Sequence, residues 1–222
     1  MFSKGGVVAR TRTERIAPLS GAVFVVLVVV AGLLVNKGDL PPAEELQAFF
    51  TEEATRIQVA GYLGVLSAVF LIWFAGSVRY GLRPAEGDTG RLSAVAFGGG
   101  AVGGGLVALV FSILAAGGNR GGTDSGIGLD AATITYDLYG SVLGVALPVT
   151  LGAMIGAAAV VAFRTRAWPT WLAWTSAIVA VGSISPVSYI FSGLDVLWIL
   201  VVSIWLFAKE RTQPAAAPQI QT

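Results

Sequence analysis

Long apolar stretches alternate with short polar ones along the whole chain. Each apolar stretch is close to 20 residues, roughly the length that a helix needs to cross the hydrocarbon core of a bilayer. We therefore predict an all-α, polytopic membrane helix bundle with six transmembrane helices. The predicted spans are about 16–35, 59–78, 92–116, 139–163, 170–187 and 190–208.

The third predicted span has a glycine-rich centre at residues 97–105. Counted from Leu92 at 1.5 Å per residue, this centre lies about 15 Å deep, near the midplane of a hydrocarbon core about 30 Å thick. Unpaired peptide groups are costly in lipid, so we expect the backbone to stay helical there. Because glycines let neighbouring helices approach closely, we predict that this helix lies at the centre of the bundle and contacts at least two other spans.

The fourth predicted span carries two pairs of glycines at the four-residue spacing that favours close helix contacts. Pro148 lies between the pairs and should kink the helix, because proline removes one backbone hydrogen bond. We expect this span to be the main partner of the glycine-rich helix. The glycines assigned to helix packing are Gly99, Gly100, Gly103, Gly104, Gly140, Gly144, Gly152 and Gly156.

The polar segments divide the rest of the chain. Residues 1–15 are predicted to be a basic cytoplasmic N-terminus, 16–209 the membrane domain and 210–222 a disordered cytoplasmic tail. The first apolar run is longer than the core of a signal peptide, so we expect an uncleaved span. Apolar residues at helical spacing within 36–58 predict a helix on the membrane surface, which either leads into the second span or binds a partner. Residues 117–130 have the composition of a flexible linker.

Composition limits the chemistry that the protein can perform. The chain has 222 residues, 55% of them hydrophobic and 12% charged, with a mean hydropathy of +0.77, so it is an integral membrane protein with no room for a separate soluble domain. It has no Cys and no His, which excludes thiol nucleophiles, disulfides, histidine-based triads and thiolate or imidazole metal sites. We expect no enzymatic activity, no cofactor and no nucleic-acid partner.

Lysines and arginines favour one orientation of the six spans. With both termini in the cytoplasm, 11 of the 14 basic residues lie inside and only Lys37, Arg56 and Arg120 lie outside. This pattern is typical of a multi-pass protein of the bacterial plasma membrane. Most acidic residues fall on the outer side, which would mildly concentrate cations there. Three tryptophans at the start of the fifth span predict an interfacial belt: Trp168, Trp171 and Trp174.

Asp195 is the acidic residue that we expect at membrane depth. Counted from the cytoplasmic end of the last span, it lies roughly 9 Å below the outer surface. A carboxyl group there indicates an ion or proton site, for which we also consider Asp137 and Tyr189. The alternative is structural, because Ser192 and Asp195 have the spacing of a capping box, with Ser192 as the N-cap of a short last helix.

Three groups of residues resemble a broad group of uncharacterised six-helix membrane proteins of actinobacteria and other high-GC bacteria. The first group is Trp73-Phe74-Ala75-Gly76 with Arg79. The second is Ala85-Glu86-Gly87 followed by Gly90-Arg91-Leu92-Ser93-Ala94, and the third is Arg164 to Trp174 with its Trp-Pro-Thr-Trp-Leu-Ala-Trp core. The resemblance implies a six-helix membrane fold and implies no activity.

Three function classes follow from these observations. The first is a non-enzymatic scaffold, assembly factor or regulator, which would contact the lipid bilayer and associate with other membrane proteins or with itself through its small-residue helix faces. The alternative is a small transporter or channel for a cation, a proton or a small solute. The second alternative, a lipid-active enzyme, has no recognisable nucleophile and base.

Overall fold

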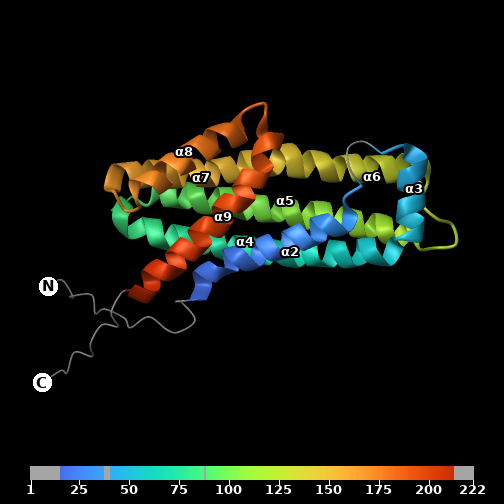
Figure 1. The fold of residues 1–222 in the computed structure, drawn as a ribbon, viewed down its shortest axis with the longest axis horizontal. Coiled ribbons are helices and arrows are strands. Elements are labelled where there is room, and N and C mark those ends of the chain that lie inside the picture. Colours follow the sequence, from blue (N-terminus) through green and yellow to red (C-terminus); the bar gives the residue numbers. More distant parts are fainter. Residues whose placement is uncertain (1–15, 38–40, 88, 213–222) are drawn as a thin grey trace, which may run out of the picture.

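A computed structural model describes residues 16–37, 41–87 and 89–212, so the predicted N-terminus and most of the predicted tail lie outside the described residues. All regular elements in these ranges are helical (Figure 1). A short 3-10 turn, η1 (Ala17–Leu19), leads into the first helix. The elements that follow are α2 (Ser20–Val35), α3 (Ala43–Glu52), α4 (Ala54–Glu86), α5 (Arg91–Gly121), α6 (Leu129–Ser141), η2 (Val142–Ala146), α7 (Leu147–Thr165), α8 (Thr170–Ile184) and α9 (Ser188–Thr212).

The long helices form an elongated bundle. In Figure 1, α4, α5 and the continuous rod of α6, η2 and α7 run side by side, and α3 lies across one end. α8 packs along α7, and α2 and α9 pack against each other as they cross the bundle. The first and last helices of the described chain are therefore neighbours.

Within the described ranges, five helices are long and apolar enough to cross a membrane: Ala17–Val35, Ala54–Glu86, Arg91–Gly121, Leu129–Thr165 and Ser188–Lys209. α8 has 15 residues and is apolar, but it extends over only about 22 Å, less than the roughly 30 Å of a hydrocarbon core. The predicted topology with six spans depends on this short helix and stays a prediction.

The glycines at the end of α5 belong to a helix, so the linker predicted from residue 117 onwards is wrong at its start. A Cβ atom on Gly117 would lie 2.7 Å from the Phe50 ring, and one on Gly118 would lie 2.9 Å from a methyl group of Ile57. Gly121 packs directly against the backbone of Phe50. Contacts from α3 and α4 thus hold this segment in a helix despite the low helix propensity of glycine.

The apolar face predicted within residues 36–58 is covered by the bundle itself. Leu46, Phe49 and Phe50 of α3 are buried, and α3 packs against α5 and α6. The Gln47 side chain donates a 2.8 Å hydrogen bond to the carbonyl of Ile127, in the loop between α5 and α6. α3 therefore closes one end of the bundle and leaves no large apolar face for a partner.

The glycine-rich centre of α5 is helical and contacts two other helices, as predicted. Gly99 approaches the backbone of α7, where a Cβ atom would lie 2.6 Å from the carbonyl oxygen of Thr150. Gly104 faces α4, and its Cβ atom would lie 2.7 Å from Ile72. Gly98 and Gly105 have open space around them, so α5 has neighbours on two sides and an exposed third side.

The glycine pairs of the fourth predicted span do not face α5, and this part of the packing prediction is wrong. A Cβ atom on Gly152 would lie 2.8 Å from Ile184, and one on Gly156 would lie 3.4 Å from Ala180, so both face α8. Gly140 has nothing within 4 Å of its Cβ position, and Gly144 approaches only Tyr189. Gly152 and Gly156 therefore allow α8 to approach α7 closely, whereas the close approach of α5 to α7 depends on glycines of α5 such as Gly99.

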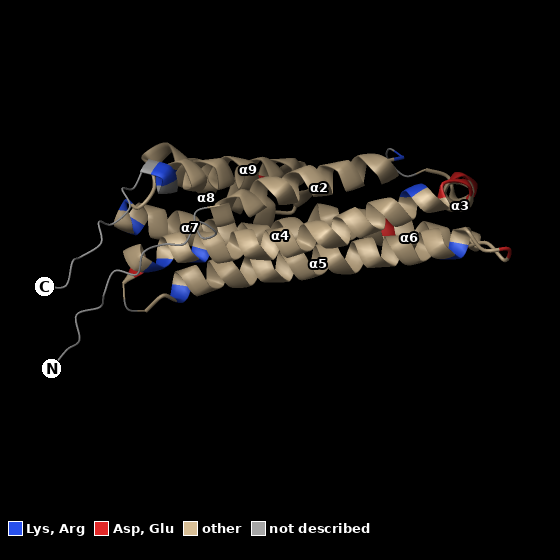
Figure 2. Cartoon of the chain, turned by 90° about the horizontal axis from the view of Figure 1, so that it is seen from below, with Lys and Arg blue, Asp and Glu red and all other residues tan. Residues whose placement is uncertain are grey.

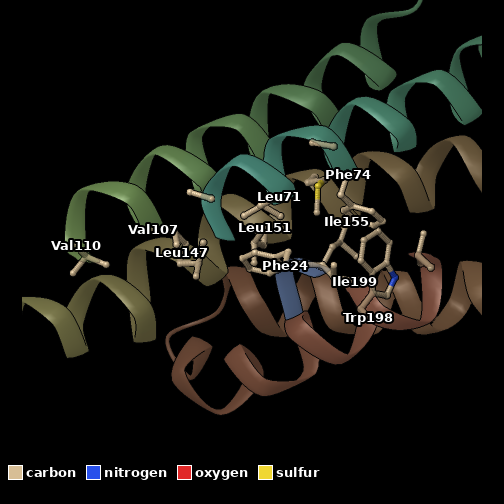
Figure 3. Close-up of a cluster of buried hydrophobic side chains, with 14 of the residues drawn as sticks. Phe24, Leu71, Phe74, Val107, Val110, Leu147, Leu151, Ile155, Trp198 and Ile199 are labelled. Atoms are coloured by element: carbon tan, nitrogen blue, oxygen red, sulfur yellow. The ribbon is translucent and has the colours of Figure 1, made fainter. Parts of the chain in front are cut away.

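Apolar side chains from α2, α4, α5, α7 and α9 form one buried cluster, which includes the place where α9 crosses the bundle (Figure 3). The rings of Phe74 on α4 and Trp198 on α9 meet edge to face, with centroids 6.4 Å apart. Phe24 of α2 and Ile155 of α7 lie in the same cluster and are fully buried. A polar group at this crossing therefore has few polar neighbours.

Candidate functional site

Asp195 is the only charged residue that is buried in the described part of the chain, with 0% of its surface exposed. It lies on α9, seven residues after Ser188, at the face that packs against α8. It lies inside an apolar helix that is long enough to span a membrane, and its depth in the membrane stays a prediction.

The capping-box interpretation of Asp195 is wrong. α9 begins at Ser188, so Ser192 and Asp195 both lie inside the helix. The Ser192 hydroxyl donates to the carbonyl of Tyr189 at 2.8 Å, and Asp195 reaches across to another helix. The local spacing suggested a helix start, but the turn at residues 185–187 lets the helix begin one turn earlier.

Among the described residues, one hydrogen bond joins the carboxyl group of Asp195 to a neighbour. The hydroxyl of Ser183 on α8 lies 2.7 Å from Oδ1 of Asp195. The same hydroxyl lies 2.7 Å from the carbonyl oxygen of Val179, one turn back along α8. Oδ2 of Asp195 is buried and has no hydrogen-bond partner among the described residues. Such an orphaned buried oxygen is rare in folded proteins and requires an explanation.

A second polar contact lies on the same faces of α8 and α9. Trp198 donates from its indole nitrogen to the Ser176 hydroxyl at 2.8 Å, and Ser176 donates to the carbonyl of Leu172 at 2.6 Å. Ser176 and Ser183 are seven residues apart, which places them on one side of the helix. α8 therefore presents two buried serines to α9.

No counter-ion faces Asp195 from the packed helices. η2, α2 and α8 contain no charged residue, and within α7 the only one is Arg164 in its last turn. On α9 itself the other charged residues are at the C-terminal end, from Lys209 onwards. The carboxyl group thus lies in an apolar environment, and the Ser183 hydroxyl is its one hydrogen-bond partner among the described residues.

The other two residues predicted for this site lie elsewhere. Asp137 is exposed on α6, and Tyr189 is 63% exposed on α9. No hydrogen bond joins either side chain to Asp195 within the described ranges. Ser183 was missed, although its place on an α8 face with Ser176 is a detectable signal in the sequence.

A break in the helical hydrogen bonding lies close to the start of α9. Pro148 has no N–H group to give to the carbonyl of Gly144, and the chain widens into a π-helical turn at Val142–Ala146. The hydroxyl of Ser188 donates to this carbonyl of Gly144 at 3.2 Å. The kink predicted at Pro148 thus takes the form of a wide turn, and the carbonyl of Gly144 in this turn accepts a hydrogen bond from the first turn of α9.

Two hollows on the surface lie away from Asp195. One, of about 490 Å³, lies between the start of α5 and the end of α7; its lining includes Arg91, Arg164 and Glu86. The other, of about 800 Å³, is a largely apolar groove between η1 and α4, with Trp73 and Tyr80 in its wall. Groups of three or more acidic side chains that could hold a metal ion do not occur in the described ranges.

Charge is divided between the two ends of the bundle. Figure 2 shows most of the lysines and arginines at the end of the bundle where α4, α7 and α9 finish, and acidic residues on α3 at the opposite end, where a few basic residues also lie. Among the predicted belt residues, Trp171 and Trp174 are exposed, but Trp168 is buried against Trp198 and Trp205. Trp168 therefore belongs to the core, and only two of the three tryptophans can meet lipid.

Comparisons with known proteins leave the site to be interpreted from its own geometry. No protein-family model, curated protein or solved structure matches the chain.

Proposed function

We propose that the protein is a small transporter or channel for protons or cations in the bacterial plasma membrane, with Asp195 as the binding group. The observation that carries this proposal is a fully buried carboxyl group, in a helix long enough to span a membrane, without a counter-ion among the described residues. Ionisable groups inside membrane segments are costly and by default mark ion pathways or proton relays.

The energetic argument excludes a purely passive role for an ionised Asp195. Burying an isolated carboxylate is far more costly than burying a neutral polar group, and a serine hydroxyl offers only one hydrogen bond. An apolar residue of similar size would pack at this position without that cost. A residue that costs stability at a helix interface is most easily explained by the ion that it binds.

The π-helical turn at η2 is a place where the α6–α7 rod could bend during transport. Interrupted helices next to ion sites are common in transporters, and π-helical turns occur frequently at functional positions. The hydrogen bond from Ser188 to Gly144 joins this break to the first turn of α9, two turns from Asp195. A change in the position of α9 would therefore alter both the break and the binding group.

The proposed orientation places both termini in the cytoplasm, with six spans that include the short α8. The basic end of the bundle then faces the cytoplasm, and the acidic α3 end faces outwards. An acidic outer end would raise the local concentration of cations. The resemblance to six-helix proteins of actinobacteria agrees with this location.

Reconstitution into vesicles tests the proposal. With an imposed pH or cation gradient, vesicles that contain the wild-type protein should show a flux that Asp195→Asn abolishes. Asp137→Asn is the matched control, because it removes an exposed acidic charge from α6 and should leave the flux unchanged. Equal flux in wild-type and Asp195→Asn vesicles would reject the transport role.

A second candidate function is that of a scaffold, which the open face of α5 favours. Gly98 and Gly105 have no atoms near their Cβ positions, and Val102 between them is 56% exposed. Small residues on a lipid-facing helix allow another helix to approach closely. Purification in mild detergent distinguishes the two candidates, because a scaffold should retain a stoichiometric partner that Gly105→Leu displaces.

A further inference from the structure

Two buried serines at the α9 contacts, Ser176 and Ser203, share a bonding pattern in which the hydroxyl accepts one hydrogen bond and donates another. Ser176 accepts from the indole of Trp198 and donates to the carbonyl of Leu172. Ser203 of α9 accepts from the amide of Ala22 at 3.1 Å and donates to the carbonyl of Pro18 at 2.5 Å. In both cases the group that gives the hydrogen bond to the serine is an N–H, which can only donate.

The hydroxyl of Ser183 also has two polar neighbours, but both are oxygen atoms and neither is an N–H group. Its oxygen lies 2.7 Å from the carbonyl of Val179 and 2.7 Å from Oδ1 of Asp195. A serine hydroxyl has one hydrogen, so it donates to only one of these two oxygens. If Asp195 were ionised, one of the two contacts would bring together two acceptors with no hydrogen between them. A neutral Asp195 removes this conflict, because its O–H donates to Ser183 and Ser183 donates to Val179.

We propose that Asp195 holds a proton in this conformation and donates it in a hydrogen bond to Ser183, so that the ion bound at this site is a proton and not a metal cation. This inference rests on the site of the proposed function and specifies its ligand. The protonated Asp195 then gives Ser183 a hydrogen bond, as the indole N–H of Trp198 gives one to Ser176. Oδ2 then becomes a neutral carbonyl oxygen, for which the absence of a partner costs much less than for a negative charge.

The surroundings of Asp195 favour a proton over a metal cation. Calcium takes six to eight oxygen ligands and magnesium six, and both require more oxygen atoms than one carboxyl group and one hydroxyl. Among the described residues packed around it, none that could neutralise a carboxylate faces Asp195: α2, α8 and η2 have no charged residue, Arg164 is in the last turn of α7, and the remaining charges of α9 follow Ala208. A bound proton needs only one acceptor, which Ser183 provides.

Infrared difference spectroscopy of the purified protein at neutral pH tests this inference. The wild type should show the carbonyl stretch of a protonated carboxylic acid, and the band should be absent in Asp195→Asn and present in the control Asp137→Asn. Ser183→Ala should keep the band but shift it to higher frequency, because the acid loses its hydrogen-bond acceptor. Should Asp195→Asn fail to fold, this shift in Ser183→Ala provides the same test.

Two results would overturn the inference. One is a spectrum in which neither substitution changes an acid band. The other is an acid band that disappears when sodium or potassium is added at constant pH, because the cation would then replace the proton.

Failure of the inference can be distinguished from failure of the proposed function. Flux in vesicles without an acid band would overturn the protonated state and leave transport in place. An acid band without flux would support the protonated state and reject transport.

Discussion

Replacing Gly99 by alanine should separate α5 from α7. The added Cβ atom would lie 2.6 Å from the carbonyl oxygen of Thr150 and 2.8 Å from the amide nitrogen of Met154. Both atoms belong to the backbone of α7, which cannot turn aside as a flexible side chain can. To reach ordinary contact at about 3.4 Å, the two helices must move apart by about 0.8 Å.

The expected cost follows from the packing that this movement disrupts. Overpacking of a close-packed interface costs about 1–3 kcal/mol. Gly98, the preceding residue, provides a matched control, because a Cβ atom there has nothing within 4 Å. Gly98→Ala should be neutral or stabilise the helix by up to about 1 kcal/mol, since alanine has the higher helix propensity. The two variants should therefore differ by about 1–4 kcal/mol.

Reversible unfolding in mixed micelles, followed by helical circular dichroism, measures this difference. Gly99→Ala should unfold at a lower denaturant concentration than the wild type, and Gly98→Ala at the same or a higher one. Equal unfolding free energies for both variants would show that the α5–α7 approach is not as close as described, and would refute the reasoning.

Two further predictions concern the helix break and the topology. Ser188→Ala should lower the unfolding free energy by about 1–3 kcal/mol, because the carbonyl of Gly144 loses its partner; in a Pro148→Ala background, where an N–H is restored, the loss should be smaller. An equal loss in both backgrounds would contradict the role given to Ser188. Reporter domains fused after Asn119 and after Thr222 should report opposite sides of the membrane; if both report the same side, the arrangement with six spans and a cytoplasmic C-terminus is wrong.

Hydropathy located the apolar helices, but it could not show how they contact one another. The segment that begins at Gly117 has the composition of a loop, and it is helical because Phe50 and Ile57 fill the space that its missing side chains leave. Those contacts come from residues more than 60 positions away. A local pattern carries no information about them.

The candidate site illustrates the same limit. The depth of Asp195 follows from counting residues along an apolar run, and the sequence predicted its importance for that reason. Its competing interpretation as a cap depended on where α9 begins, which the turn before Ser188 determines. The bond to Ser183 requires the register between two antiparallel helices, and the spacing of Ser183 along α8 alone does not supply that register.

The contact of Ser203 with the first helix has a consequence for the order of assembly. Its hydroxyl is inserted between the amide of Ala22 and the carbonyl of Pro18, two groups that would otherwise bond to each other within the helix. During synthesis the first helix enters the membrane long before residue 203 leaves the ribosome. Until α9 docks, the amide of Ala22 can bond to the carbonyl of Pro18 within the opening turn of α2, so the insertion of Ser203 would open a hydrogen bond that α2 had already closed.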